Sequence, residues 1–270
     1  MSSKALIKLL LKPFLIVAWL LSGLQVGYAA TYTLAVQPTM PMEQTESFYR
    51  PLTDYLSAQT GHTFKIQAQH NYVAYWEALR RENVDLALEA AHFTGHRVAK
   101  ANYQVIAKIL DTLSFSLVTN EDLLLFEPNE LIGKKVVTPA SPSLSGVELA
   151  RMFPNQMRQP TITSVSNFQQ ALQQLKAGRA TAALVPTTLV SGDLTVNTVA
   201  TTEPVPHLAV SASPNLPADV RQKIQQALLT ANDNPQGQGM LQKVNISGFE
   251  KASNALYRPY DSLLQGVWGY

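Results

Sequence analysis

The sequence has 270 residues, with 21 lysines and arginines, 19 aspartates and glutamates, and no cysteine. Without cysteine the chain can form no disulfide framework and carries no lipid on an N-terminal cysteine. Its formal charge of +2 and the lack of a long Lys/Arg run exclude an extended basic patch of the kind that binds nucleic acid or an anionic membrane.

The first 30 residues have the pattern of an export signal. Three lysines precede an apolar run at 14–21 that is short for a membrane span, and small residues follow up to Ala29 and Ala30. We expect cleavage after Ala29 or Ala30 and a soluble protein of the periplasm. Loss of the three lysines leaves 18 basic against 19 acidic residues, so the mature chain is close to neutral.

Hydrophobic periodicity in the first half of the mature chain predicts strands that alternate with helices. Gly61 is well placed to end the first helix, in which Pro51 would lie near the first turn. The expected strands are 31–36, 63–68, 84–88, 103–110 and 114–118, and the expected helices are 48–60, 72–82 and 89–100.

The second half repeats this order and contains a serine-rich turn. The expected strands are 136–137, 161–165, 181–185, 194–200 and 207–211, and the expected helices are 130–132, one starting near Ser145, 166–176, 217–229 and a C-terminal tail. Such a β–α rhythm predicts an α/β protein with largely parallel sheets, and ligand chemistry beyond the carboxyl ends of the strands.

The turn before the helix near Ser145 has the composition of an anion site. Ser143 and Ser145 could add hydroxyls to the free N–H groups and the positive dipole end of that helix, which can hold a phosphate-like or carboxylate group. The alternative is that Ser145 is only an N-cap and Pro142 only a turn former.

Several short sequence segments resemble those of periplasmic substrate-binding proteins of ABC importers, of the phosphate/phosphite/phosphonate-binding type. The resemblance covers nearly all of the mature chain and rests on residues 48–56, 60–61, 77–87, 131–136, 143–146, 171–178 and 216–220. It implies a two-lobe type II periplasmic-binding-protein fold, each lobe a mostly parallel sheet flanked by helices, with a hinge of crossing strands. Lobe one would be 31–115 and 204–270, and lobe two 116–203.

The resemblance also implies a ligand site in the cleft between the lobes. Tyr72 matches a tyrosine that lines the family's cleft, and Ser143 and Ser145 match hydroxyls of its Ser-Thr-Ser-Gly turn. The expected ligand-binding residues are Tyr72, Glu89, His92, Ser141, Ser143, Leu144, Ser145 and Ser166. The expected partners are a small-molecule ligand and an inner-membrane ABC permease, with no cofactor, no nucleic acid and a monomeric chain.

The sequence departs from the family pattern at four places. Leu144 replaces the middle hydroxyl of the turn, and Val165 or Ser166 stands where a histidine is frequent. Pro186 replaces an acidic residue, and 89–92 reads Glu-Ala-Ala-His where Gly-Pro or Asn-Pro is usual. We expect a small oxyanion or a zwitterion as the ligand.

Glu89 has three possible roles, since a carboxylate facing the cleft would repel an anion. It could pair with an amine of the ligand, form a solvated ion pair with Arg97, or join His92 and His96 on one helix face as a metal ligand.

The metal alternative is a copper or zinc protein that uses Glu89, His92 and His96 together with Met40 and Met42. A further alternative is a sensor or partner-binding protein without transport. The common nucleophile, zinc-protease and nucleotide-binding motifs are missing from the sequence, so we expect no enzyme.

Overall fold

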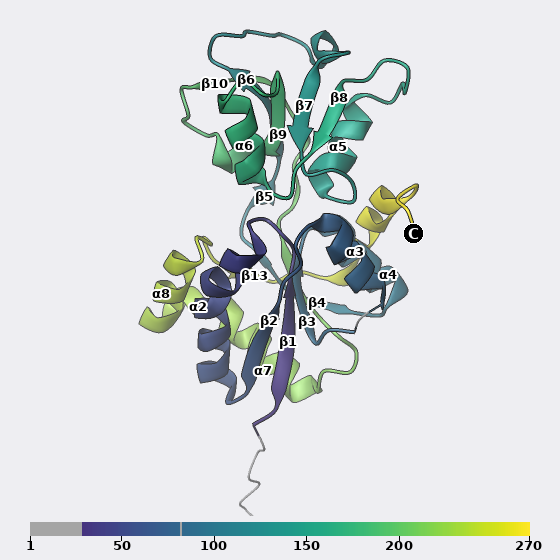
Figure 1. Ribbon diagram of the computed structural model, residues 1–270. Helices are drawn as coiled ribbons and strands as arrows, with labels where there is room; N and C mark the ends of the chain where they lie inside the picture. Colours follow the sequence, from purple (N-terminus) through teal and green to yellow (C-terminus); the bar gives the residue numbers. More distant parts are fainter. Residues whose placement is uncertain (1–28, 82) are drawn as a thin grey trace, which may run out of the picture. The chain divides into compact units, whose positions relative to one another are not determined.

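The computed structural model describes residues 29–81 and 83–270 (Figure 1). All but the last two residues of the predicted export signal therefore lie outside the described residues. Within the described ranges no helix combines the length and the apolar character that crossing a membrane requires. These ranges form two larger sheets and one small ribbon of two strands.

The six-stranded sheet has the order β13-β4-β12-β3-β1-β2. β1 pairs in parallel with β2 and β3, whereas β12 is antiparallel to β3 and β4, and β13 is antiparallel to β4. The sheet is therefore mixed, with four strands in one direction and β12 and β13 in the other, in agreement with the expected mostly parallel sheet. Its strands are β1 (Thr31–Val36), β2 (Thr63–Gln67), β3 (Leu86–Glu89), β4 (Gln104–Ile109), β12 (Ala209–Ala212) and β13 (Phe249–Glu250).

Helices cover both faces of this sheet, α2 on one side and α3 and α4 on the other (Figure 1). Alternation along β1 explains the two layers: Leu34 and Val36 belong to the larger apolar cluster that contains α2 residues, and Ala35 belongs to the cluster of α3 aromatic rings. The helices are α2 (Met42–Thr60), α3 (Tyr72–Arg81), α4 (Ala91–Lys100), α7 (Ala218–Leu229) and α8 (Pro235–Lys243).

The five-stranded sheet has the order β10-β6-β9-β7-β8 and is mixed as well. β7 is parallel to β8 and β9, and β6 is antiparallel to β9 and β10. Its elements are β6 (Phe115–Asn120), β7 (Lys135–Thr138), α5 (Leu144–Met152), β8 (Thr161–Ser164), α6 (Phe168–Lys176), β9 (Ala182–Pro186) and β10 (Val196–Thr201).

Two chain segments connect the larger sheets, and they pair with each other. β5 (Thr112–Leu113) follows the six-stranded sheet and is antiparallel to β11 (Val205–Pro206), which leads back to it. The remaining short elements are η1 (Pro128–Leu131), η2 (Thr187–Leu189), η3 (Ala231–Asp233), α9 (Asn254–Tyr257) and η4 (Arg258–Leu264).

The predicted elements are present, and α2 differs most from its prediction. It starts at Met42, before the expected 48–60 segment, so Pro51 lies in its interior and not near its first turn. Gly61 ends the helix in the left-handed conformation, with its N–H bonded to Ser57 O. The extension of α2 places its first turn directly after the loop that follows β1.

Candidate functional site

An apolar cavity of about 320 Å³ lies between segments of the two larger sheets. The side of the six-stranded sheet contributes the loop after β1, the start of α3 and the end of β3, and the other side contributes the starts of α5 and α6 and the end of β9. No Asp, Glu, Lys or Arg side chain lines it among the described residues. The aromatic and aliphatic lining includes Met40, Phe48, Tyr49, Tyr72, Leu144 and Phe168.

A smaller and more polar cavity of about 250 Å³ shares Tyr72 with the apolar one. Its polar lining consists of amides and hydroxyls, from Asn71, Ser164, Ser166, Gln170 and Gln174. Here too no charged side chain lines the cavity within the described ranges. An anion in this space would have to be held by neutral donors and helix dipoles.

Two helices begin at the polar cavity. α3 starts at Tyr72, where Asn71 Oδ1 accepts a hydrogen bond of 2.9 Å from Ala74 N. α6 starts at Phe168, where Asn167 Oδ1 accepts one of 3.0 Å from Gln170 N. The positive ends of both helix dipoles therefore border the same space, which favours a negatively charged group there.

Two of the predicted ligand-binding residues, Tyr72 and Ser166, line the polar cavity. Neither hydroxyl has a hydrogen-bond partner within residues 29–81 and 83–270. Burial raises the pKa of the Tyr72 phenol above its ordinary range, so the phenol remains protonated and can donate a hydrogen bond. The structure thus brings these two residues together.

The hydroxyls of Ser143 and Ser145 are used inside their own turn, and both residues are fully buried. Ser143 Oγ donates to Pro139 O and accepts from Gly146 N at 2.9 Å, which makes Ser143 the N-cap of α5. Ser145 Oγ accepts from Thr138 Oγ1 at 2.9 Å. These bonds correct the expectation that both hydroxyls are free for a ligand, and they also correct the alternative in which Ser145 is the cap.

The other residues of the turn differ in position. Leu144, at the first position of α5, lines the apolar cavity. Ser141 is exposed and lines neither cavity.

Across from the turn, fully buried His92 places Nε2 2.8 Å from Pro142 O. Burial lowers the pKa of His92 to about 4. The ring is therefore neutral, with Nε2–H as the donor to the carbonyl.

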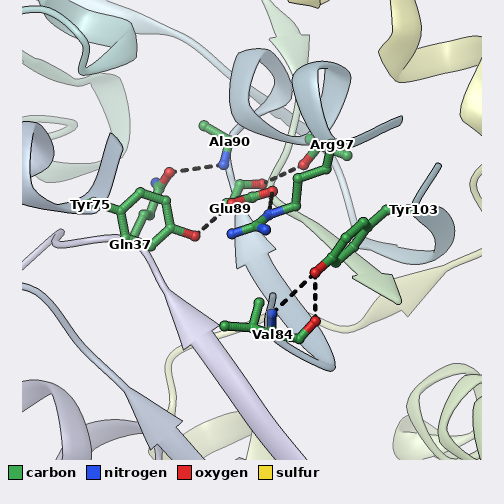
Figure 2. A network of polar contacts seen from close by, with 8 residues as sticks. Gln37, Tyr75, Val84, Glu89, Ala90, Arg97 and Tyr103 are labelled. Carbon is green, nitrogen blue, oxygen red and sulfur yellow. Dashed lines mark hydrogen bonds and ion pairs between the residues drawn. The ribbon is translucent and has the colours of Figure 1, made fainter. Parts of the chain in front are cut away.

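Glu89 is fully buried and bonded within its own half of the protein (Figure 2). Tyr75 Oη donates to Glu89 Oε2 at 2.5 Å, and Arg97 Nε lies 2.8 Å from Oε1. Burial raises the pKa of Glu89, and Arg97 opposes that rise. The pair with Arg97 exists, but it is buried rather than solvated. Glu89 lines neither cavity.

The proposed metal ligands do not converge. His92 is bonded to Pro142, His96 Nδ1 lies 3.0 Å from Asp261 Oδ1, and Glu89 is bonded to Arg97. The described residues contain no group of three or more His, Cys, Asp or Glu side chains that could hold a metal ion. Met40 lines the apolar cavity and Met42 begins α2. The metal alternative therefore has no support.

His207 lines the apolar cavity and was not predicted as a site residue. Its Nδ1 accepts a hydrogen bond of 2.8 Å from Leu208 N, so Nε2 carries the proton of the neutral ring. Burial lowers the pKa of His207 to about 4, with a contribution from Lys108. The sequence contained no signal for this role, because His207 reaches the cavity only when β11 pairs with β5 and β12 pairs with β4.

The model of one protein family, "ABC transporter, phosphonate, periplasmic substrate-binding protein", matches residues 34–257. No curated protein sequence matches the chain. Among solved structures, PhnD1 from Prochlorococcus marinus in complex with methylphosphonate has a TM-score of 0.76 at 14% identity, covering 88% of this chain and 98% of that one.

Two further solved structures are similar. The binding protein component of an ABC phosphonate transporter from Pseudomonas aeruginosa has a TM-score of 0.73 at 14% identity, with 87% and 85% of the chains covered. XAC2383 from Xanthomonas citri bound to chloride has a TM-score of 0.72 at 16% identity, with 88% and 98% covered. These likenesses confirm the two-lobe type II fold. Together with the family match, they show that the chain belongs to the periplasmic substrate-binding proteins of phosphonate ABC transporters.

Proposed function

We propose that this chain captures a phosphonate or a related small oxyanion in the periplasm and presents it to an ABC permease. The ligand would bind between lobe one, 31–115 and 204–270, and lobe two, 116–203. The observation that carries the proposal is the polar cavity, because the starts of α3 and α6 both border it. Two helix dipoles favour an anion in a cavity without cationic side chains.

In this proposal Tyr72 and Ser166 donate to the oxygens of the ligand from opposite lobes. Contacts made from both sides stabilise the closed form more than the open form, which couples binding to closure. Ser143, Ser145 and Gly146 do not contact the ligand in this proposal. They hold the start of α5 in place, where Leu144 lines the apolar cavity.

We further propose that the chain acts as a monomeric receptor without catalysis, after removal of the first 29 or 30 residues. The family match supports a binding role beside a transporter. The hydroxyls of Ser143 and Ser145 are engaged in hydrogen bonds inside their own turn, and none of these bonds is to a histidine or a carboxylate that could activate a nucleophile.

The test is calorimetry and thermal unfolding of the mature chain with phosphate, phosphite, methylphosphonate and 2-aminoethylphosphonate. A ligand at about a hundred times its Kd should add about 2.7 kcal/mol of stability, or roughly 5–10 °C in Tm. The proposal fails if none of these compounds raises Tm.

The variant Tyr72→Phe removes the shared hydroxyl with little change in shape. We expect binding at least about tenfold weaker, since a hydrogen bond to a charged group contributes roughly 1.5–3 kcal/mol. Tyr270→Phe is the matched control, because that hydroxyl bonds to Asp261 at the surface, 2.8 Å away. Equal affinities for the two variants would remove Tyr72 from the site.

A further inference from the structure

We infer that the ligand carries an apolar organic substituent, and that this substituent fills the cavity of about 320 Å³ beside the proposed oxyanion subsite. The inference rests on the proposed function, and it narrows the ligand from oxyanions in general to phosphonates with a sizeable alkyl or aryl group. Phosphate and phosphite lack any group that could occupy this space.

The chemistry of the lining is the first argument. Phe48, Leu113, Phe115, Leu144 and Phe168 supply carbon surface, and no charged side chain reaches the cavity from the described residues. A second charged or strongly polar group would lose its hydration here without a counter-charge. An alkyl or aryl group loses only unfavourable contact with water.

Polar residues also line the cavity: Gln37, Thr39, Tyr49, Tyr72, Gln169, Thr188, His207 and Asn245. Gln37 Oε1 accepts a hydrogen bond of 2.8 Å from Ala90 N at the end of β3, which holds the start of the loop after β1. The apolar residues outnumber the polar ones, and none of the polar ones is an acid or a strong base. The lining therefore favours an apolar substituent over a second charged group.

The position of Tyr72 is the second argument. Its side chain lines both cavities, so the polar and the apolar space meet at one residue. A phosphonate bound near the Tyr72 hydroxyl has its P–C bond as the only link to an organic group. That substituent can extend into the apolar cavity, whereas the oxygens face the starts of α3 and α6.

The third argument is size. A cavity of this volume lies within the range of sites for small organic ligands, which is roughly 300–1,000 Å³. A bare tetrahedral oxyanion would leave most of this space, including its larger apolar part, to water.

The experiment is calorimetry of the mature chain with methyl-, butyl-, hexyl- and benzylphosphonate, with hexanol and benzyl alcohol as uncharged counterparts. We expect Kd to fall about fourfold for each added methylene between the methyl and hexyl compounds. A flat series with measurable methylphosphonate binding would overturn this inference and leave the proposed function intact.

Two other outcomes separate the inference from the function on which it rests. Binding of the uncharged compounds without any binding of phosphonates would overturn the proposed function and preserve the apolar subsite. Failure of every compound to bind would overturn both. The readout is therefore different for each failure.

A filled-cavity variant locates the subsite. Thr188 is exposed, lies on η2 and lines the cavity, so Thr188→Trp adds bulk there without disturbing the core. We expect this variant to bind methylphosphonate like the parent and to lose at least tenfold in affinity for hexylphosphonate. Thr198→Trp, at an exposed position of the edge strand β10, is the control. Unchanged hexylphosphonate binding by Thr188→Trp would overturn the placement.

Discussion

Glu89 shows how one neighbour decides the role of a buried carboxylate. Its place at the end of β3 suggested a ligand contact, and the sequence also allowed a pair with Arg97. The structure places both groups in the interior, with Tyr75 as a second donor to the carboxylate. The geometry is that of an ionised carboxylate with its acceptors occupied, so its charge is compensated before any anion enters the cleft.

Removal of Arg97 should be more harmful than removal of the whole charge pair. Arg97→Met leaves Glu89 buried without its counter-charge, and we expect a loss of about 3–5 kcal/mol in the free energy of unfolding. The double variant Glu89→Gln/Arg97→Met should recover part of that loss. Urea unfolding measures both, and a double variant no more stable than the single one would contradict this account.

The serine turn shows what a sequence can and cannot say about an element. Its residues predicted a helix start near Ser145, and α5 starts at Leu144. The direction of the serine hydroxyls was not predictable, because Pro139 O and Thr138 Oγ1 reach them only after β7 and the turn have folded back on α5. A capped helix and an anion site have the same local sequence.

The close approach of the turn to the start of α5 also requires a glycine at position 146. A Cβ at this position would lie 2.2 Å from Ser141 N and 2.5 Å from Ala140 C, both backbone atoms that cannot move independently. We expect Gly146→Ala to cost about 1–3 kcal/mol, the usual range for overpacking.

The control for Gly146 lies in α8, where a Cβ at Gly239 would meet nothing within 4 Å. Gly239→Ala should leave stability unchanged or raise it by up to about 1 kcal/mol, because alanine favours the helix. Thermal unfolding of both variants decides between packing and helix propensity. A Gly146→Ala protein as stable as its parent would show that the turn can open.

At the scale of the whole molecule, the sequence order predicted the two lobes better than it predicted the site. The alternation of strands and helices, together with the sequence segments that resemble the family, predicted the two-lobe fold that the solved structures share. Strand direction was less predictable, because β12 and β13 join the first sheet from the far end of the chain and run antiparallel to their neighbours. His207 reaches the cavity by this return, and no local pattern marks it.

One hydrogen bond links the two halves directly across the cleft. His92, in the first turn of α4, donates from Nε2 to Pro142 O in the loop before α5. Separation of the two lobes would break this bond, so it stabilises forms in which α4 and the loop before α5 lie close together. An open form would exchange it for water at a net cost of about 0.5–1.5 kcal/mol.

Loss of this bond should weaken ligand binding at a distance. His92→Ala should shift the free protein toward open forms, and the apparent affinity falls with the population of the closed form. We expect Kd to rise about two- to tenfold and the radius of gyration of the free protein in small-angle X-ray scattering to increase. His92→Gln can place an amide N–H near the same carbonyl and should restore most of the affinity. His62→Ala is the control, since that ring packs on Tyr32 at the opposite end of β1 and β2. If His92→Ala matches the control in both measurements, the bond between the lobes does not set the balance between open and closed forms.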